Sequence, residues 1–314
     1  MKMSSMAVEF ARPSVALLLF ACAFGEVQLC GMGPGFSAAW VHRGHESLLL
    51  TVFPMVGQKK TITLPHVPLN VTVSAFAADG IYLQPATLEP SGIIKVEFQP
   101  LRTSVVPGAA EFRTIWNLRA LPSGMILIAG LSGKFGECGT FEIDPTAGTS
   151  RPLLVGRFPD CGGGGGTISP DGRRVVSYNR EDLSIVDLTD NTIQAIKGIP
   201  GRSTLTGPGW PHSAAWSPDG KWISVVLEGG DLFLVDTTDT SKRKRLGRSD
   251  GPSVWSPDAE QLLLPKSELR CKPSLYFESL QSVDVATGTR TAIPSSHCEV
   301  GAGWYGWVDS KVVE

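Results

Sequence analysis

The sequence predicts an all-β protein, a six-bladed β-propeller whose blades are four-stranded antiparallel sheets. A short turn signature recurs at residues 168–172, 216–220 and 255–259, where a bulky apolar residue precedes Ser-Pro-Asp and then Gly, Gly or Ala. Each copy is followed by an apolar strand and then by a second apolar strand that ends in Asp. Repeats of short strands with a period of roughly 40 to 50 residues are typical of propeller blades.

The blade around Trp216 is the clearest copy of the repeat. Four strands joined by short turns are expected there, at residues 213–216, 222–227, 232–236 and 241–246. The first turn suits Pro-Asp-Gly because Pro presets φ, Asp accepts hydrogen bonds from its own backbone and Gly accepts a positive φ. The third copy has Ala259 in place of Gly, so a positive φ there should cost about 1 kcal/mol.

The same plan extends over the rest of the chain. The anchor residues of the copies fall at 40, 76, 121, 168, 216 and 255, and a further strand begins at Trp304. Residues 37–40 match residues 213–216 and are expected to form the corresponding strand of the first blade. We expect residues 307–313 to pair with the N-terminal strands and close the ring, which removes free sheet edges. Seven blades are the alternative, because the first hundred residues are weakly patterned.

Residues 216–221, Trp-Ser-Pro-Asp-Gly-Lys, followed by an apolar strand and Val-Asp, resemble the WD-like repeat of TolB-type propellers. The propeller domains of prolyl oligopeptidase relatives carry a similar repeat. The resemblance is specific across residues 165–290 and loose elsewhere. We expect neither the α/β domain that precedes the propeller in TolB nor a following hydrolase domain. The resemblance implies a propeller that binds a protein or peptide partner in the cell envelope.

The N-terminus has the pattern of an export signal over residues 1–25, followed by a single propeller domain over residues 30–314. A modestly basic start precedes an apolar run at residues 15–24, and small residues precede Glu26. That run is too short to span a bilayer. Because residues 19–22 resemble a lipobox, a lipid anchor at Cys22 is an alternative. We therefore expect a periplasmic or secreted protein, either free or lipid-tethered.

Four of the six cysteines are expected to form two disulfides, Cys138–Cys161 and Cys271–Cys298. In each pair one cysteine comes just before the third strand of its blade and the other just after the fourth. An exported protein lies where disulfides persist, and a closed loop of about 25 residues is worth roughly 3 kcal/mol. Four buried free thiols are the alternative. With no Cys-x-x-Cys spacing present, we expect no metal.

Motifs of enzymatic chemistry are scarce. We expect no serine hydrolase, no catalytic residue and no cofactor. Residues 42–46, His-Arg-Gly-His-Glu, are expected to form a solvated loop, and the basic run at residues 242–245 to guard an outermost strand. A net charge of −2 gives no argument for nucleic acid as a partner.

The loops on the disulfide-bearing face form the candidate binding surface. Loops on a rigid scaffold are where binding residues concentrate, and aromatic residues with Arg are frequent anchors. The candidate residues are Arg180, Glu181, Trp210, His212, Glu228, Asp231, Trp304 and Tyr305. The favoured function is a non-enzymatic envelope propeller that binds a protein or peptide. The alternatives are a lactonase-like hydrolase with a channel metal and a detached propeller that gates a separately encoded peptidase.

Overall fold

The computed structural model describes most of the chain between residues 36 and 310. The described ranges are 36–44, 46–54, 58–77, 79–85, 92–121, 123–134, 136–155, 167–178, 182–200, 213–227, 229–267, 279–293 and 303–310. They belong to one compact unit, Met32–Glu314. Within these ranges the chain forms six four-stranded antiparallel sheets and no α-helix. The predicted all-β class is therefore confirmed, and the count is six blades rather than seven.

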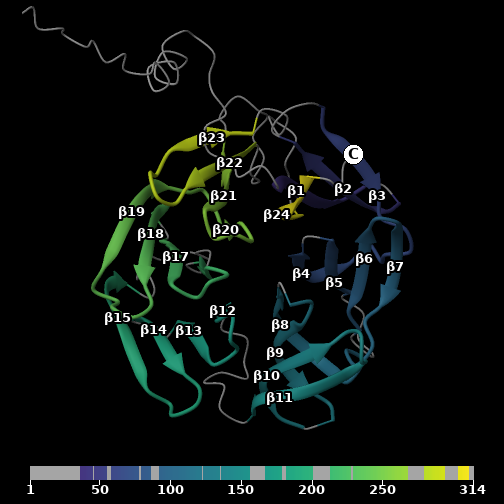
Figure 1. The fold of residues 1–314 in the computed structure, drawn as a ribbon, viewed down its shortest axis with the longest axis horizontal. Helices are drawn as coiled ribbons and strands as arrows, with labels where there is room; N and C mark the ends of the chain where they lie inside the picture. Colours follow the sequence, from purple (N-terminus) through teal and green to yellow (C-terminus); the bar gives the residue numbers. More distant parts are fainter. Residues whose placement is uncertain are drawn as a thin grey trace, which may run out of the picture. The chain divides into compact units, whose positions relative to one another are not determined.

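The six sheets are the blades of a propeller and surround a central axis (Figure 1). We number the blades 1 to 6 in chain order. Their innermost strands are, in that order, β24 (Gly303–Asp309), β4 (Val71–Ala77), β8 (Phe112–Ala120), β12 (Thr167–Ile168), β16 (Ser213–Trp216) and β20 (Val254–Trp255). Each innermost strand contacts the innermost strands of both neighbouring blades, including β20 with β24 and β24 with β4, so the ring is closed.

The remaining strands follow from the axis outward in every blade. The second strands are β1 (Phe36–Arg43), β5 (Gly80–Pro85), β9 (Ile126–Ser132), β13 (Arg174–Tyr178), β17 (Trp222–Val226) and β21 (Gln261–Lys266). The third strands are β2 (Leu48–Phe53), β6 (Ile94–Phe98), β10 (Cys138–Asp144), β14 (Asp182–Asp187), β18 (Asp231–Asp236) and β22 (Ser279–Asp284). The outermost strands are β3 (Lys60–Thr63), β7 (Leu101–Val105), β11 (Thr149–Val155), β15 (Ile193–Pro200), β19 (Arg243–Arg248) and β23 (Arg290–Ala292).

Blade 1 is made from both ends of the described chain. Strand β24 pairs antiparallel with β1, with Trp307 opposite Ala38, so the predicted ring closure is confirmed. The predicted position of residues 37–40 is wrong, because they lie in the second strand of blade 1 rather than in its innermost strand. The C-terminal strand takes the innermost place and shifts the N-terminal strands one position outward. The local Ser-Ala-Ala-Trp pattern occurs at either position: residues 37–40 are all buried in β1, whereas in β16 only Trp216 is buried and the three residues before it are partly exposed.

In the Ser-Pro-Asp-Gly turns, the aspartate carboxylate accepts hydrogen bonds from other groups of the same turn. The hydroxyl of Ser217 donates to Asp219 Oδ1 at 2.7 Å, and the amide two residues beyond Asp219 donates to the same oxygen at 3.1 Å. Ser217 Oγ in turn accepts the amide of Trp222 at 2.9 Å. The same three hydrogen bonds recur in the turns that begin at Ser169 and Ser256. The repeated Asp is therefore a turn-forming residue.

The fourth residue of the turn adopts the left-handed conformation in all three copies. The φ angles are 73° at Gly172, 72° at Gly220 and 63° at Ala259. Ala259 therefore has the positive φ for which a cost of about 1 kcal/mol was predicted. L-residues other than Gly, Asn and Asp rarely take this conformation, because the Cβ approaches the backbone.

The Asp that ends the third strand of several blades also forms a turn. Asp236 Oδ1 accepts the amide of Thr238 at 2.8 Å, and Asp284 Oδ1 accepts the amide of Thr287 at 2.7 Å. Asp144 and Asp187 accept main-chain amides in the same way. The recurring Asp thus starts the turn to the outermost strand, as expected for a side chain that mimics a backbone acceptor.

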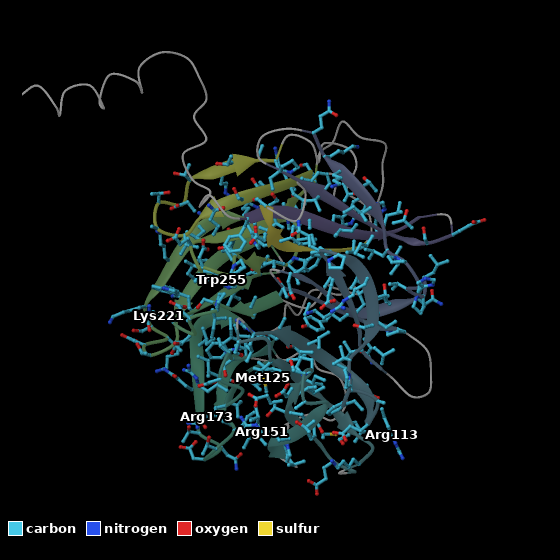
Figure 2. The ribbon with its side chains drawn as sticks, turned by 45° about the vertical axis from the view of Figure 1, so that its right-hand side comes forward. Arg113, Met125, Arg151, Arg173, Lys221 and Trp255 are labelled. Atoms are coloured by element: carbon cyan, nitrogen blue, oxygen red, sulfur yellow. The ribbon has the colours of Figure 1, made fainter. Side chains whose placement is uncertain are left out.

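Buried tryptophans link successive blades through main-chain hydrogen bonds. In three blades an indole N–H on the innermost strand donates to a carbonyl on the innermost strand of the preceding blade. The pairs are Trp216 with Thr167 at 2.9 Å, Trp255 with Ala215 at 2.9 Å and Trp307 with Val254 at 3.1 Å. These tryptophans are almost fully buried, so the repeat-position residues Trp216 and Trp255 belong to the core. Figure 2 shows Trp255 among the strands, whereas Lys221 and Arg173 lie toward the edge of the molecule.

Candidate functional site

The predicted binding surface is described at two of its eight side chains, those of Asp231 and Tyr305. The backbone of Trp304 lies in β24, but its side chain is not among those described. The remaining candidates lie outside the described residues: Arg180, Glu181, Trp210, His212 and Glu228. The predicted signal at residues 1–25 and the alternative anchor Cys22 also lie outside them. These assignments stay predictions.

Asp231 is a surface carboxylate that already has a cationic partner. It is the first residue of β18, and its Oδ1 accepts hydrogen bonds from Arg245 Nη2 at 2.6 Å and from Arg245 Nε at 3.2 Å. The two side chains are 39% and 59% exposed, so this ion pair adds little to stability. A ligand at Asp231 would therefore meet an Arg–Asp pair rather than a single negative charge.

Tyr305 lies on the innermost strand β24 and uses its hydroxyl inside the protein. The phenol O–H donates to the main-chain carbonyl of Pro252, in the segment that leads into β20. Burial raises the pKa of this phenol well above its usual range. Because the hydroxyl proton is already donated, Tyr305 could offer a ligand only its ring or its hydroxyl oxygen as an acceptor.

The basic run at residues 242–245 is engaged within the protein. It lies at the start of the outermost strand β19, as predicted. Arg243 donates to the Lys197 carbonyl of the neighbouring blade at 3.0 Å, and Lys244 donates to the Val285 carbonyl at 2.9 Å. Lys242 pairs with an aspartate in its own turn at 3.5 Å. The run joins blade 5 to the blades on both sides, so it is not a patch of free cations.

His42 is not in a loop, in contrast to the expectation for residues 42–46. It is the seventh residue of β1, and its ring stacks on Trp40 with centroids 3.7 Å apart. Its Nε2 and Thr51 Oγ1 form a hydrogen bond of 3.1 Å. The strand continues further than the sequence pattern indicates because it is paired on both edges, with β2 and β24.

Cys138 is the one predicted disulfide residue that the structure describes. It is the first residue of β10, it is buried, and its sulfur is bonded rather than a free thiol. Cys161, Cys271 and Cys298 lie outside the described residues. The pairings Cys138–Cys161 and Cys271–Cys298 stay predictions.

Arg119 is a further candidate residue that the sequence pattern did not indicate. It is the penultimate residue of the innermost strand β8. Its guanidinium reaches across two further blades, with Nη1 donating to the carbonyls of Ile168 and Trp216 at 3.4 Å each. Nη2 donates to the carbonyl of Ser217 at 3.3 Å. One side chain therefore connects the ends of three successive innermost strands.

The charge of Arg119 has no carboxylate partner among the described residues. Burial lowers the pKa of this guanidinium to about 10, which still leaves it protonated at neutral pH. One feature of the sequence could have pointed to Arg119: it is a basic residue near the end of an innermost strand, whereas the innermost strands of the next three blades end in the apolar residues Ile168, Trp216 and Trp255. Arg119 and Tyr305 lie toward opposite ends of their strands, so they belong to opposite sides of the ring.

Two further observations concern chemistry and membranes. Across the described ranges, no group of three or more His, Cys, Asp and Glu side chains is arranged to hold a metal ion. Nor does that part of the chain contain a helix long and apolar enough to cross a membrane.

The fold defines the chain as a six-bladed β-propeller closed by its C-terminal strand. No protein-family model and no curated protein matches the sequence. Among solved structures, TolB from Acinetobacter baumannii is similar at a TM-score of 0.57 and 15% identity, over 88% of this chain and 67% of that one. A putative TolB from Agrobacterium tumefaciens is similar at a TM-score of 0.51 and 15% identity, over 83% of this chain and 89% of that one. The chain is therefore a TolB-like propeller in its fold.

Proposed function

We propose that this chain is an exported, non-enzymatic propeller that binds a protein or peptide partner in the cell envelope. The observation that supports this proposal is the closed ring with the TolB-like fold. The sequence resemblance to TolB-type propellers implies the same class of function. The predicted loops of one face supply the binding residues.

The ring is well suited to hold such loops in place. Indole–carbonyl hydrogen bonds join blade 4 to 5, blade 5 to 6 and blade 6 to 1 through their innermost strands. Main-chain acceptors fix these contacts independently of loop sequence. Loops positioned by a rigid scaffold are frequent carriers of binding residues, which is what the proposal requires.

Partner binding can be tested by site-specific photocrosslinking in cells. A photoreactive phenylalanine analogue replaces Asp231 on the proposed face, and a matched control replaces Arg151 on the outermost strand β11. We expect one dominant adduct with the probe at position 231 and a much weaker one at position 151. No adduct at either position, or equal adducts at both, would overturn the proposal.

Export can be tested separately from binding. The full chain with a C-terminal tag is expressed in a Gram-negative bacterium, fractionated by osmotic shock and analysed by N-terminal sequencing. The proposal expects a periplasmic product that begins near Glu26. A membrane-associated product that begins at a modified Cys22 would support the lipid-anchored form. An uncleaved chain confined to the cytoplasm would contradict export.

A further inference from the structure

The innermost strands of blades 3, 4 and 5 end around one guanidinium. The carbonyls of Ile168, Trp216 and Ser217 accept hydrogen bonds from Arg119 at 3.3 to 3.4 Å. These distances are longer than those of strong charge-assisted hydrogen bonds, which are about 2.7 to 2.9 Å. The contacts hold the side chain in place but leave much of its hydrogen-bonding capacity unused.

A guanidinium has five N–H donors, and its fork matches the two oxygens of a carboxylate or phosphate. At Arg119 the described contacts use only Nη1 and Nη2, and no acceptor for the Nε–H lies among the residues with described structure. The edge of the fork that includes Nε is therefore not occupied by this part of the chain.

The charge of Arg119 is also uncompensated within the part of the chain that the structure describes. Arginines that do have carboxylate partners, such as Arg151 with Glu142 and Arg245 with Asp231, lie on outermost strands, and most of each arginine side chain is exposed. Arg119 instead lies on an innermost strand, partly buried, with neutral carbonyls as its acceptors in the described ranges. Burying a cation without an anion is costly, so an incoming anion would offset that cost.

We propose that Arg119 is the anchor of a binding site for an anionic group, a carboxylate or a phosphate, at this end of the innermost strands. The three carbonyls orient the guanidinium, and its remaining donors hold the anion in a bidentate contact. The site lies at the end of the strands opposite to Tyr305, so it is separate from the proposed partner surface. It does not depend on the proposed function, because it can be tested with small anions on the purified chain.

The test is isothermal titration of the purified chain with inorganic phosphate and, separately, with acetate, at constant ionic strength. We expect one-to-one binding of at least one of these anions by the wild type. The variant Arg119→Gln should bind at least tenfold more weakly. Arg151→Gln, which removes an exposed arginine from an outermost strand, is the matched control and should bind like the wild type.

The two anions distinguish the source of the ligand. Binding of phosphate alone would assign the site to a phosphate group, and binding of acetate would assign it to a carboxylate. For the latter, a short peptide with a free C-terminus should bind and its C-terminal amide should not. No binding of either anion by the wild type, or unchanged binding by Arg119→Gln, would overturn the proposal.

Arg119→Gln must also be shown to fold, because Arg119 connects three blades. Circular dichroism and thermal unfolding provide that check. If Arg119→Gln does not fold, Arg119→Lys keeps the charge but removes the planar fork. Anion binding weakened severalfold in Arg119→Lys would then support the site, and unchanged binding would overturn it.

Discussion

The indole N–H of Trp307 donates a hydrogen bond of 3.1 Å to the carbonyl of Val254, and so joins the last strand of the chain to blade 6. The same strand pairs with β1 on its other side. Trp307 therefore lies where the two ends of the propeller are held together. Trp216 makes the equivalent contact inside the ring, between blades 4 and 5.

Replacing Trp307 by Phe should lower the free energy of unfolding by about 1 to 3 kcal/mol. The indole donor is lost, the partly buried carbonyl of Val254 loses its partner and the smaller ring packs less well. Chemical denaturation followed by tryptophan fluorescence and circular dichroism measures the change. Trp216→Phe is the comparison for a link within the ring, and a Trp307→Phe variant as stable as the wild type would contradict the role of this hydrogen bond.

Replacing Ala259 by Gly should raise the free energy of unfolding by about 1 kcal/mol, because a φ of 63° strains an Ala but not a Gly. Urea unfolding of the two proteins provides the measurement. In the opposite direction, Gly220→Ala should cost a similar amount. A Cβ at Gly220 would meet nothing closer than Pro170 Cδ at 3.7 Å, so φ strain alone is introduced.

Gly172→Ala should cost more than Gly220→Ala, although the two φ angles differ by little. A Cβ at Gly172 would overlap Leu153 Cδ1 on the neighbouring blade, so packing strain is added to backbone strain. Parallel denaturation of both variants tests the order. Equal losses of stability would show that Leu153 moves aside without cost.

Stability should fall in acid partly through the turn-forming aspartates. The main-chain amide of Thr287, with its hydroxyl, lowers the pKa of Asp284 below its ordinary value of 3.8. Since the pKa is lower in the folded state, this stabilisation is present above pH 3.8 and is lost as the pH falls through the folded value. We expect the free energy of unfolding to drop between roughly pH 4 and pH 2.

The variant Asp284→Asn should show a smaller drop over that window, because it has no carboxylate to protonate. Chemical denaturation at stepped pH values measures both proteins. Asp236, whose pKa is lowered by the hydroxyl and amide of Thr238, offers an independent repeat of the experiment as Asp236→Asn. Wild-type and variant curves that fall in parallel would contradict this contribution.

The first three strands of the clearest blade could be predicted from sequence almost to the residue, whereas its outermost strand β19 lies two residues further along than predicted. Strand β16 coincides with the predicted 213–216, and β17 and β18 differ from the prediction by one residue at one end. Local information suffices there, because turn residues and apolar alternation both specify the same strand ends. The innermost place of β24 depends instead on pairing with β1, a contact between the two ends of the described chain.

Arg119 could not be predicted as a site for a related reason. Its three acceptors lie 49, 97 and 98 residues further along the chain. They come together only when the ring is assembled, and main-chain carbonyls leave no mark in the sequence. The turn carboxylates present the opposite case, since their partners lie within a few residues and the motif itself reveals them.

Because β24 completes blade 1, the propeller can close only late in the synthesis of the chain. Strands β1, β2 and β3 are synthesised first, yet blade 1 lacks its innermost strand until residues 303–309 have been made. Domains generally begin to form from the N-terminus during synthesis, but this ring cannot be completed in that way. A chain interrupted anywhere before β24 would keep an open edge on blade 1, exposed to association with other chains. The closed ring can therefore form only after all six blades, including β24, have been synthesised.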